Sequence, residues 1–232
     1  MRFLILFLAV AFAAMPFFIR FNGFQPSLYP IPQEDPAIQP AGWAFSIWGV
    51  IYVALIVHAV YGVLRADDPA WSNKKFPLTI SLAIGVIWLP VAGYSPVWAT
   101  LLILIMLFGA LLALFFGLTA REPWRMDLPL GLYAGWLTAA SFVSLGLLTA
   151  GYGLILGDVG WARVLLPAAV LFAATIQWNL GFVPGYGAAV IWALIGVVAQ
   201  AASPHPDVAI LAGIGIVVLG GVLLATYRRK MA

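Results

Sequence analysis

The sequence predicts an all-α integral membrane protein, a helical bundle of about eight transmembrane helices. Of its 232 residues, 64% are hydrophobic and only 8% are charged, and the mean hydropathy is +1.07. Soluble domains carry about 25% charged residues, so this chain cannot cover a water-facing surface of that size. Long apolar runs recur along the whole chain, and the short alternating segments typical of a membrane β-barrel are absent.

The length of each apolar run decides whether it can cross the membrane as a helix. A helix rises about 1.5 Å per residue, so about 20 residues cross the hydrocarbon core. The two shortest runs, 77–94 and 186–203, still meet the lower limit. The runs are residues 1–19, 43–64, 77–94, 97–120, 128–156, 162–182, 186–203 and 207–227. The direct count is therefore eight helices.

The positions of Lys and Arg predict the orientation. With both termini in the cytoplasm, nine basic residues lie in inside segments and two, Arg20 and Arg163, lie outside. This asymmetry follows the positive-inside rule and requires an even number of spans. We expect a multi-pass protein, in a bacterial inner membrane, and no nucleic-acid partner for the basic residues. The inside group is Arg2, Arg65, Lys74, Lys75, Arg121, Arg125, Arg228, Arg229 and Lys230.

The first run has an alternative interpretation as a cleaved signal peptide, because Arg2 precedes an apolar stretch and the small residues "AFAA". The run is long, and Pro16 and "FFIRF" follow it in place of a clean cleavage region. We therefore expect it to remain as a helix.

The longest hydrophilic segment, residues 20–42, contains five prolines. Proline prevents a regular helix there and favours an extended, fairly stiff path. We expect an ordered cap over the outer face, with a plain linker as the alternative.

Three of the runs carry at least one large aromatic residue beside small residues on a single helical face, at about 100° per residue. Helix packing and interface anchoring explain any one such stripe, whereas three together favour a shared aromatic cavity. The stripes are Phe45, Trp48, Tyr52, Leu55 and Ala59; then Ser81, Gly85, Trp88 and Ala92; then Tyr133, Trp136, Ala140 and Ser144.

The residues around these stripes resemble three motifs of the translocator protein/tryptophan-rich sensory protein family (TspO/MBR). "PAGWAFSIWGVIY" resembles the second-helix signature P-x-x-W-x-x-x-P-I-W-G-x-L-Y, with Ser46 in place of Pro and one residue fewer between the tryptophans. "GVIWLP" resembles N-x-x-W-x-P, with Gly85 in place of Asn. "LYAGWLTAASFVS" resembles P-Y-L-A-W-x-x-F-A-x-x-x-N, with Leu132 in place of Pro and Ser144 in place of Asn.

The resemblance covers about residues 1–155 and implies a TspO-like five-helix core over residues 1–156. Residues 157–232 are expected to form an additional three-helix membrane segment. Members of that family bind porphyrins, and some bind sterols, in a pocket closed by the first loop; bacterial members act in tetrapyrrole and carotenoid regulation. The resemblance thus implies a membrane-embedded binding or sensory protein for a hydrophobic, tetrapyrrole-like ligand. The ligand-binding residues it implies are Trp43, Phe45, Trp48, Tyr52, Trp88, Tyr133, Trp136, Ala140 and Ser144.

A bound porphyrin or haem is the cofactor that this resemblance allows, although no motif requires one. An iron porphyrin could use an axial histidine, and His58 is the one histidine within a span. We favour the other interpretation of His58, a neutral side chain bonded to a neighbouring helix.

Catalytic and metal-binding groups are not evident. The chain has no Cys, no carboxylate, Lys or Arg lies in the middle of a span, and no catalytic triad can be assembled. We therefore expect no enzyme.

A small-molecule transporter and a structural or assembly subunit of a membrane pigment complex remain alternatives. The expected partners are the lipid bilayer, the hydrophobic ligand, and either a second copy or a membrane-complex partner docked on the small-residue segment "GIGIVVLGG". Gln177 and Asn179 are polar candidates near a span end, where loop capping explains them equally well.

Overall fold

The computed structural model describes residues 1–19, 24–65, 74–117 and 123–231, and within these ranges it contains eight α-helices and no strand. Two 3₁₀ turns, η1 (Pro26–Leu28) and η2 (Gly42–Ser46), and a π-helical turn, η3 (Pro123–Asp127), join them. The all-α fold is confirmed. The helices are α1 (Arg2–Phe18), α2 (Ile47–Leu64), α4 (Lys75–Ala92), α5 (Pro96–Phe116), α6 (Leu128–Gly151), α7 (Asp158–Leu180), α8 (Pro184–Ala201) and α9 (Pro206–Met231).

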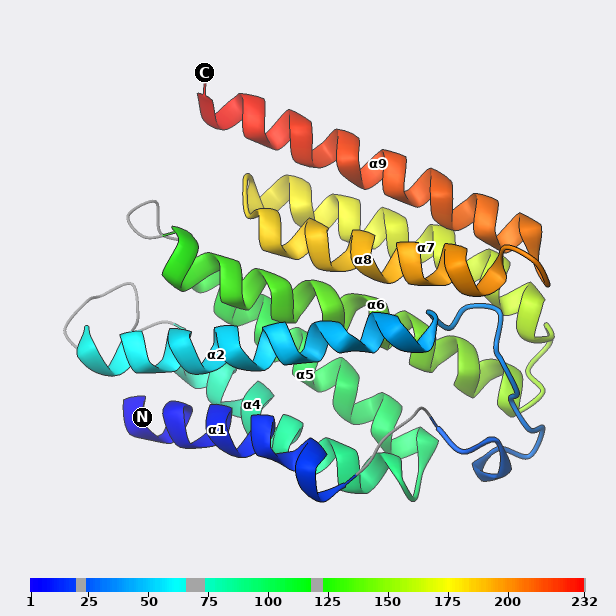
Figure 1. Cartoon of the computed structure of the whole chain (residues 1–232), viewed down its shortest axis with the longest axis horizontal. Helices are drawn as coiled ribbons and strands as arrows, with labels where there is room; N and C mark the ends of the chain where they lie inside the picture. The colour runs from blue at the N-terminus through cyan, green and yellow to red at the C-terminus, as the bar shows by residue number, and fades with distance from the viewer. Residues whose placement is uncertain (20–23, 66–73, 118–122, 232) are drawn as a thin grey trace.

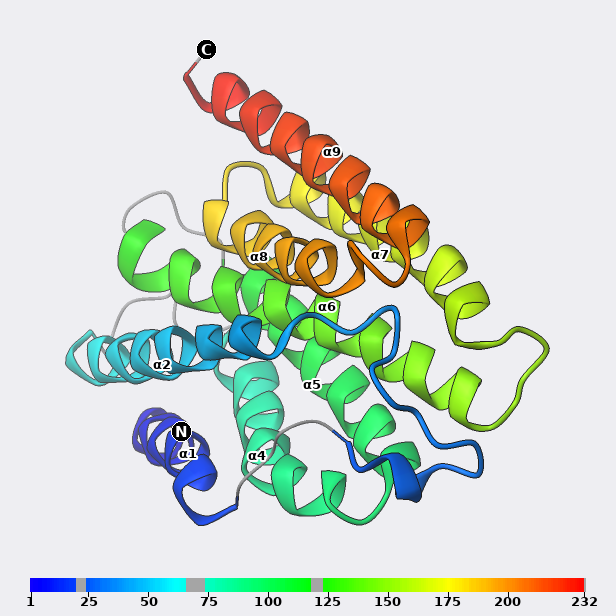
Figure 2. The ribbon, with the colours of Figure 1, turned by 45° about the vertical axis from the view of Figure 1, so that its right-hand side comes forward.

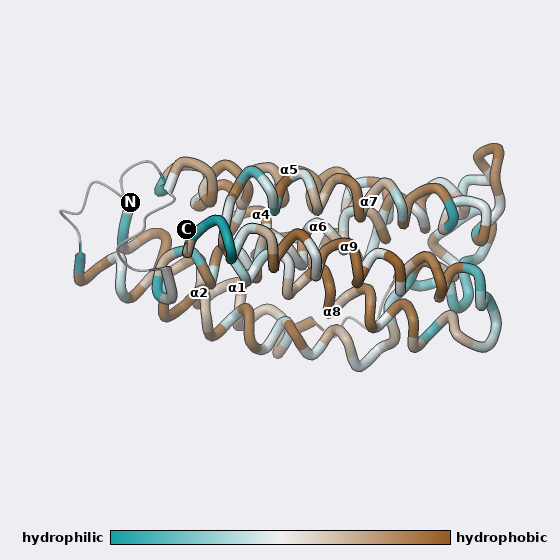
Figure 3. Tube along the Cα trace, turned by 90° about the horizontal axis from the view of Figure 1, so that it is seen from above, coloured by the Kyte–Doolittle hydropathy of each residue, from teal (hydrophilic) through white to brown (hydrophobic). Residues whose placement is uncertain are grey.

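The helices run roughly along one direction, with apolar residues along their lengths (Figure 3). Of the described helices, seven are long and apolar enough to cross a membrane, and α1, with 17 residues, is shorter. At 1.5 Å per residue, α1 reaches only the lower limit of a span. Both termini lie at the same end of the bundle (Figure 1), as an even number of spans requires.

Five helices close into a ring. Helix α1 packs against α2 and α4, α4 packs against α5, α5 against α6, and α6 against α2. Helix α1 belongs to this ring through Ile5, Ala9 and Phe12, which are buried.

The last three helices form a second layer on one side of α6 (Figure 2). Helices α7 and α8 pack against α6, and α9 packs against both of them. The division into a 1–156 core and a 157–232 segment as separate domains stays a prediction from the sequence.

Glycines bring α6 and α8 into close contact. A Cβ atom on Gly131 would lie 2.9 Å from the backbone nitrogen of Tyr186, and one on Gly135 would overlap the Tyr186 carbonyl. Small residues at a four-residue spacing allow this approach in membranes. The Tyr186 hydroxyl then lies 3.0 Å from Thr138 Oγ1, which itself donates to the Ala134 carbonyl. The Tyr186 hydroxyl is therefore the donor to Thr138.

Several helix ends differ from the predicted ranges, and the C-terminal ends of α6 and α9 are two of them. Helix α6 ends at Gly151 because Gly153 turns the chain with a φ of +66°, although apolar residues continue to 156. Helix α9 extends to Met231, past the predicted end at 227, with Arg228, Arg229 and Lys230 in its last turn. Basic side chains stabilise that end of a helix through its dipole.

A buried ion pair joins α4 to α6 at the end of the bundle where the termini lie. Lys74 Nζ donates to Asp127 Oδ1 at 3.0 Å, and both side chains are almost fully buried. This pair could not be predicted from the sequence, because the two residues are 53 positions apart and each stands at a predicted span end.

Candidate functional site

A cavity of about 380 Å³ lies inside the five-helix ring, in the half next to residues 24–46. Small-molecule sites in proteins have volumes of about 300–1,000 Å³. Its walls are almost entirely apolar and come from α1, α2, α4, α5 and α6, and its cap comes from the segment between α1 and α2. The lining includes Phe12, Pro16, Phe17, Phe24, Gln39, Pro40, Phe45, Trp48, Gly49, Tyr52, Trp88, Met106, Trp136, Ala140 and Ser144.

Three rings from α1 and α2 form one wall. Trp48 stacks on Tyr52 with ring centres 5.3 Å apart, because the four-residue spacing puts them one turn apart on α2. Phe12 of α1 meets both rings edge-on, at 5.5 Å and 5.1 Å. Edge-to-face contacts between aromatic rings are energetically favourable, so they hold these three rings in one arrangement.

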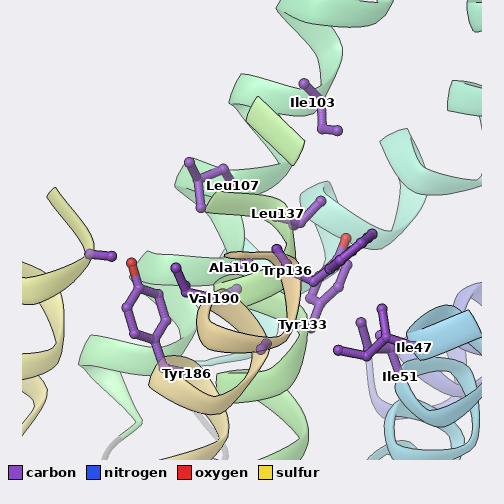
Figure 4. Packing of buried hydrophobic residues seen from close by; sticks show 14 of the residues in the cluster. Ile47, Ile51, Ile103, Leu107, Ala110, Tyr133, Trp136, Leu137, Tyr186 and Val190 are labelled. Atoms are coloured by element: carbon purple, nitrogen blue, oxygen red, sulfur yellow. The ribbon is translucent and has the colours of Figure 1, made fainter. Parts of the chain in front are cut away.

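Helix α6 supplies the facing wall. Trp136 meets Phe45 and Trp48 edge-on, at 5.7 Å and 6.3 Å. Figure 4 shows Trp136 and Tyr133 near Ile47 and Ile51 of α2. The Trp136 indole nitrogen is buried and, within the described part of the chain, has no hydrogen-bond partner.

Helix α4 contributes Trp88, whose half-buried ring requires a partner for its indole N–H. That group donates to the Ala99 carbonyl of α5 at 2.9 Å. Phe24, at the start of the described loop, meets the Trp88 ring edge-on at 6.1 Å. Trp88 is thus held from both sides.

The structure brings seven of the nine predicted ligand-binding residues to this cavity. They are Phe45, Trp48, Tyr52, Trp88, Trp136, Ala140 and Ser144. That they bind a ligand stays a prediction.

The other two, Trp43 and Tyr133, are not among the lining residues. Tyr133 is fully buried, and its hydroxyl lies 2.9 Å from Ser81 Oγ, which donates to the Met106 carbonyl. The Tyr133 hydroxyl therefore donates to Ser81. Trp43 is 47% exposed and packs edge-on against Trp192 of α8.

His58 is buried and does not line the cavity. Its Nδ1 lies 3.1 Å from the Arg125 carbonyl in η3, and only a protonated Nδ1 can donate there. The interpretation of His58 as a group bonded to a neighbouring segment is confirmed.

Phe12 is the main lining residue that the sequence analysis missed. It stands in an apolar run with no motif around it, and nothing in that run singles it out. The sequence feature that relates to Phe12 is the glycine against which its ring packs. A Cβ on Gly85 would lie 3.1 Å from the Phe12 ring, so glycine at this motif position makes room for the ring.

The cavity reaches the outer surface of the bundle between the end of α1 and the start of α2. Phe17 is 89% exposed, yet it lines the cavity together with exposed Pro16 and Gly49. A Cβ on Gly49 would meet nothing within 4 Å.

The polar amides of α7 have a local role. Gln177 is buried, donates to the Gly181 carbonyl at 2.8 Å and accepts from the Gly187 N–H at 2.9 Å. It therefore caps the turn between α7 and α8. Asn179 donates back to the Thr175 carbonyl at 2.8 Å.

A family model described as TSPO-like protein matches residues 2–225. The chain belongs to this family. The match passes beyond the five-helix ring and covers α7, α8 and most of α9, so the second helical layer is part of the TSPO-like family pattern. Searches of curated proteins and of solved structures each returned no match.

Proposed function

We propose that this TSPO-like protein binds a hydrophobic, planar, tetrapyrrole-like molecule within the membrane and acts in sensing or handling it. The observation that carries the proposal is the cavity inside the ring, whose walls bring together Trp48, Trp88 and Trp136 from three helices. Aromatic rings bind a wide π-face by stacking and by burying apolar area.

The lining favours a metal-free porphyrin over a haem. The described lining residues include no histidine, and His58 is bonded to Arg125 instead. They also include no carboxylate, Lys or Arg, which favours binding over turnover. The buried indole N–H of Trp136 offers one donor to a ligand acceptor that reaches it.

Titration of the purified protein with protoporphyrin tests this proposal. Binding should quench tryptophan fluorescence, and Trp48→Ala and Trp136→Ala should each weaken the affinity about tenfold or more, since each removes a large contact surface. Trp178→Ala is the control, because Trp178 is 48% exposed and lies outside the cavity lining. Absence of quenching, or equal affinities in all variants, would overturn the proposal.

The orientation we propose places the cavity in the half of the membrane away from the cytoplasm of a bacterium. Arg65, Arg125 and Arg228 mark the cytoplasmic end of the bundle, in agreement with the positive-inside rule. The cap, residues 24–46, then lies on the outer side, and a ligand reaches the cavity from the outer leaflet.

A further inference from the structure

The cap over the cavity cannot hold its position by local structure alone. Its prolines prevent a continuous helix, and only short 3₁₀ turns form in it. Nevertheless, residues 36–38, 40, 41 and 44 are buried. Tyr29 is 4% exposed, and its burial raises the pKa of its hydroxyl above the ordinary value. The support must come from elsewhere in the fold.

Hydrogen bonds to α7 and α8 supply that support between residues 37 and 44. The Ala37 N–H donates to Asp158 Oδ2 at 2.9 Å, at the start of α7. The Ala41 N–H donates to the Gly196 carbonyl of α8 at 3.0 Å. The indole N–H of Trp192, one turn earlier on α8, donates to the Ala44 carbonyl at 2.8 Å.

Close packing accompanies these bonds. A Cβ on Gly196 would lie 2.8 Å from the Cβ atoms of both Pro40 and Ala44, so glycine is needed for α8 to approach the cap. The Trp192 ring meets Trp43 edge-on at 5.1 Å. The same stretch of chain also lines the cavity through Gln39, Pro40 and Phe45. One side of the cap thus rests on α8 while the other closes the cavity.

We infer that α7 and α8 hold the cap of the cavity, and that Trp192 and Gly196 are positioning residues that set the rate of ligand release. Neither residue lines the cavity, so each acts through residues 37–45. This inference rests on the proposed function for its ligand and gives the second helical layer a role in binding. It also accounts for Trp43, which is held by Trp192 and has no place in the cavity wall.

Replacement of Trp192 by Phe keeps an aromatic ring against Trp43 and removes the N–H that Ala44 accepts. The loss of one such bond should speed the dissociation of protoporphyrin about two- to tenfold. The measurement is a competition experiment in lipid nanodiscs that follows porphyrin fluorescence. Trp161→Phe is the matched control, because it removes an indole bond of 2.7 Å to the Leu154 carbonyl and leaves residues 37–44 untouched.

Hydrogen–deuterium exchange of the ligand-free protein measures directly how firmly residues 37–45 are held. Trp192→Phe and Gly196→Val should speed exchange in peptides covering residues 37–45 and leave α4 and α5 unchanged. Gly196→Ala should show the same changes to a smaller degree, which covers the case in which Gly196→Val does not fold. A purely structural role would lower the unfolding temperature without changing the dissociation rate below it.

The outcomes separate the two proposals. If the wild-type protein does not bind protoporphyrin, the proposed function fails, and unchanged exchange at residues 37–45 in Trp192→Phe would then also overturn the role of α8. If the protein binds but Trp192→Phe releases the ligand at the rate of Trp161→Phe, the positioning role fails alone.

Discussion

Gly85 and Phe12 show at the scale of single residues how this chain shapes its cavity. In the family motif, Asn stands where the chain has Gly85, and the Phe12 ring lies where an added side chain would begin. An aromatic ring from α1 therefore takes the space beside this position, and the cavity wall is more apolar as a result.

Gly85→Asn should force Phe12 out of its place against the edges of Trp48 and Tyr52. Overpacking a tight site costs about 1–3 kcal/mol, so the unfolding temperature should fall and porphyrin binding should weaken. Thermal unfolding in detergent and the fluorescence titration measure the two effects. Gly157→Asn, where a Cβ meets nothing within 4 Å, is the control. Equal behaviour of the two variants would contradict the packing described for Phe12.

The buried pair of Lys74 and Asp127 leads to a second prediction at this scale. Lys74→Met removes one charge and leaves the Asp127 carboxylate buried, which should cost about 3–5 kcal/mol of unfolding free energy. The double variant Lys74→Met/Asp127→Leu should recover a large part of that loss, because both charges of the pair are then removed together. If the double variant loses as much unfolding free energy as Lys74→Met and Asp127→Leu lose in sum, the two side chains do not act as a pair.

The stripes of Trp48, Trp88 and Trp136 could be predicted because helical spacing fixes which residues share a face. Helical spacing alone does not show that Phe12 lines the cavity or that Tyr133 is not among the lining residues. Whether a residue on the inner face reaches the cavity or packs behind it depends on how far the helices approach each other. For Tyr133, the hydroxyl pairing with Ser81 decided the matter.

At the scale of elements, the opening between α1 and α2 should be the route by which a ligand arrives from the membrane. Gly49→Trp should place an indole ring in this opening, where nothing lies within 4 Å of an added Cβ. The association rate of protoporphyrin should fall about tenfold or more, with little change in the unfolding temperature.

Gly220→Trp is the control for this substitution, because Gly220 is exposed on α9 and a Cβ there also meets nothing within 4 Å. Equal association rates for the two variants would exclude the opening beside Gly49 as the route.

The helices themselves were predicted well because composition and length determine a membrane span. The errors lie where local backbone geometry overrides composition. Residues 43–46 read as part of a span but form the 3₁₀ turn η2, and the apolar residues after Gly151 follow a glycine turn. A hydropathy profile detects neither the 3₁₀ turn nor the glycine turn.

At the scale of the whole molecule, α6 is the central helix, and a weak signal for this existed in the sequence. The segment Arg125–Gly151 has one of the lowest mean hydropathies among the spans, 1.4, and the largest buried share, 67%. The corresponding values for α9, Pro206–Met231, are 2.7 and 28%. A helix shielded from lipid by other helices does not need a fully apolar surface. The pairing of α6 with α8, however, depends on glycine contacts that only the three-dimensional arrangement reveals.

The orientation can be tested directly, since the chain contains no Cys. Glu34→Cys and Ser203→Cys should react with a membrane-impermeant thiol reagent added to intact cells. Arg65→Cys and Arg229→Cys should react only after the membrane is permeabilised. The reversed pattern would contradict the proposed orientation, and labelling of Arg65→Cys and Glu34→Cys from the same side would contradict α2 as a span.

We propose that the five-helix ring encloses a binding site for a planar hydrophobic molecule. A structure of the protein determined in lipid nanodiscs with saturating protoporphyrin tests it most directly. The macrocycle should lie inside the five-helix ring, in contact with Trp48, Trp88 and Trp136 and covered by residues 39–40. A porphyrin bound on the outer surface of the helices, with this cavity empty or filled by lipid, would contradict it.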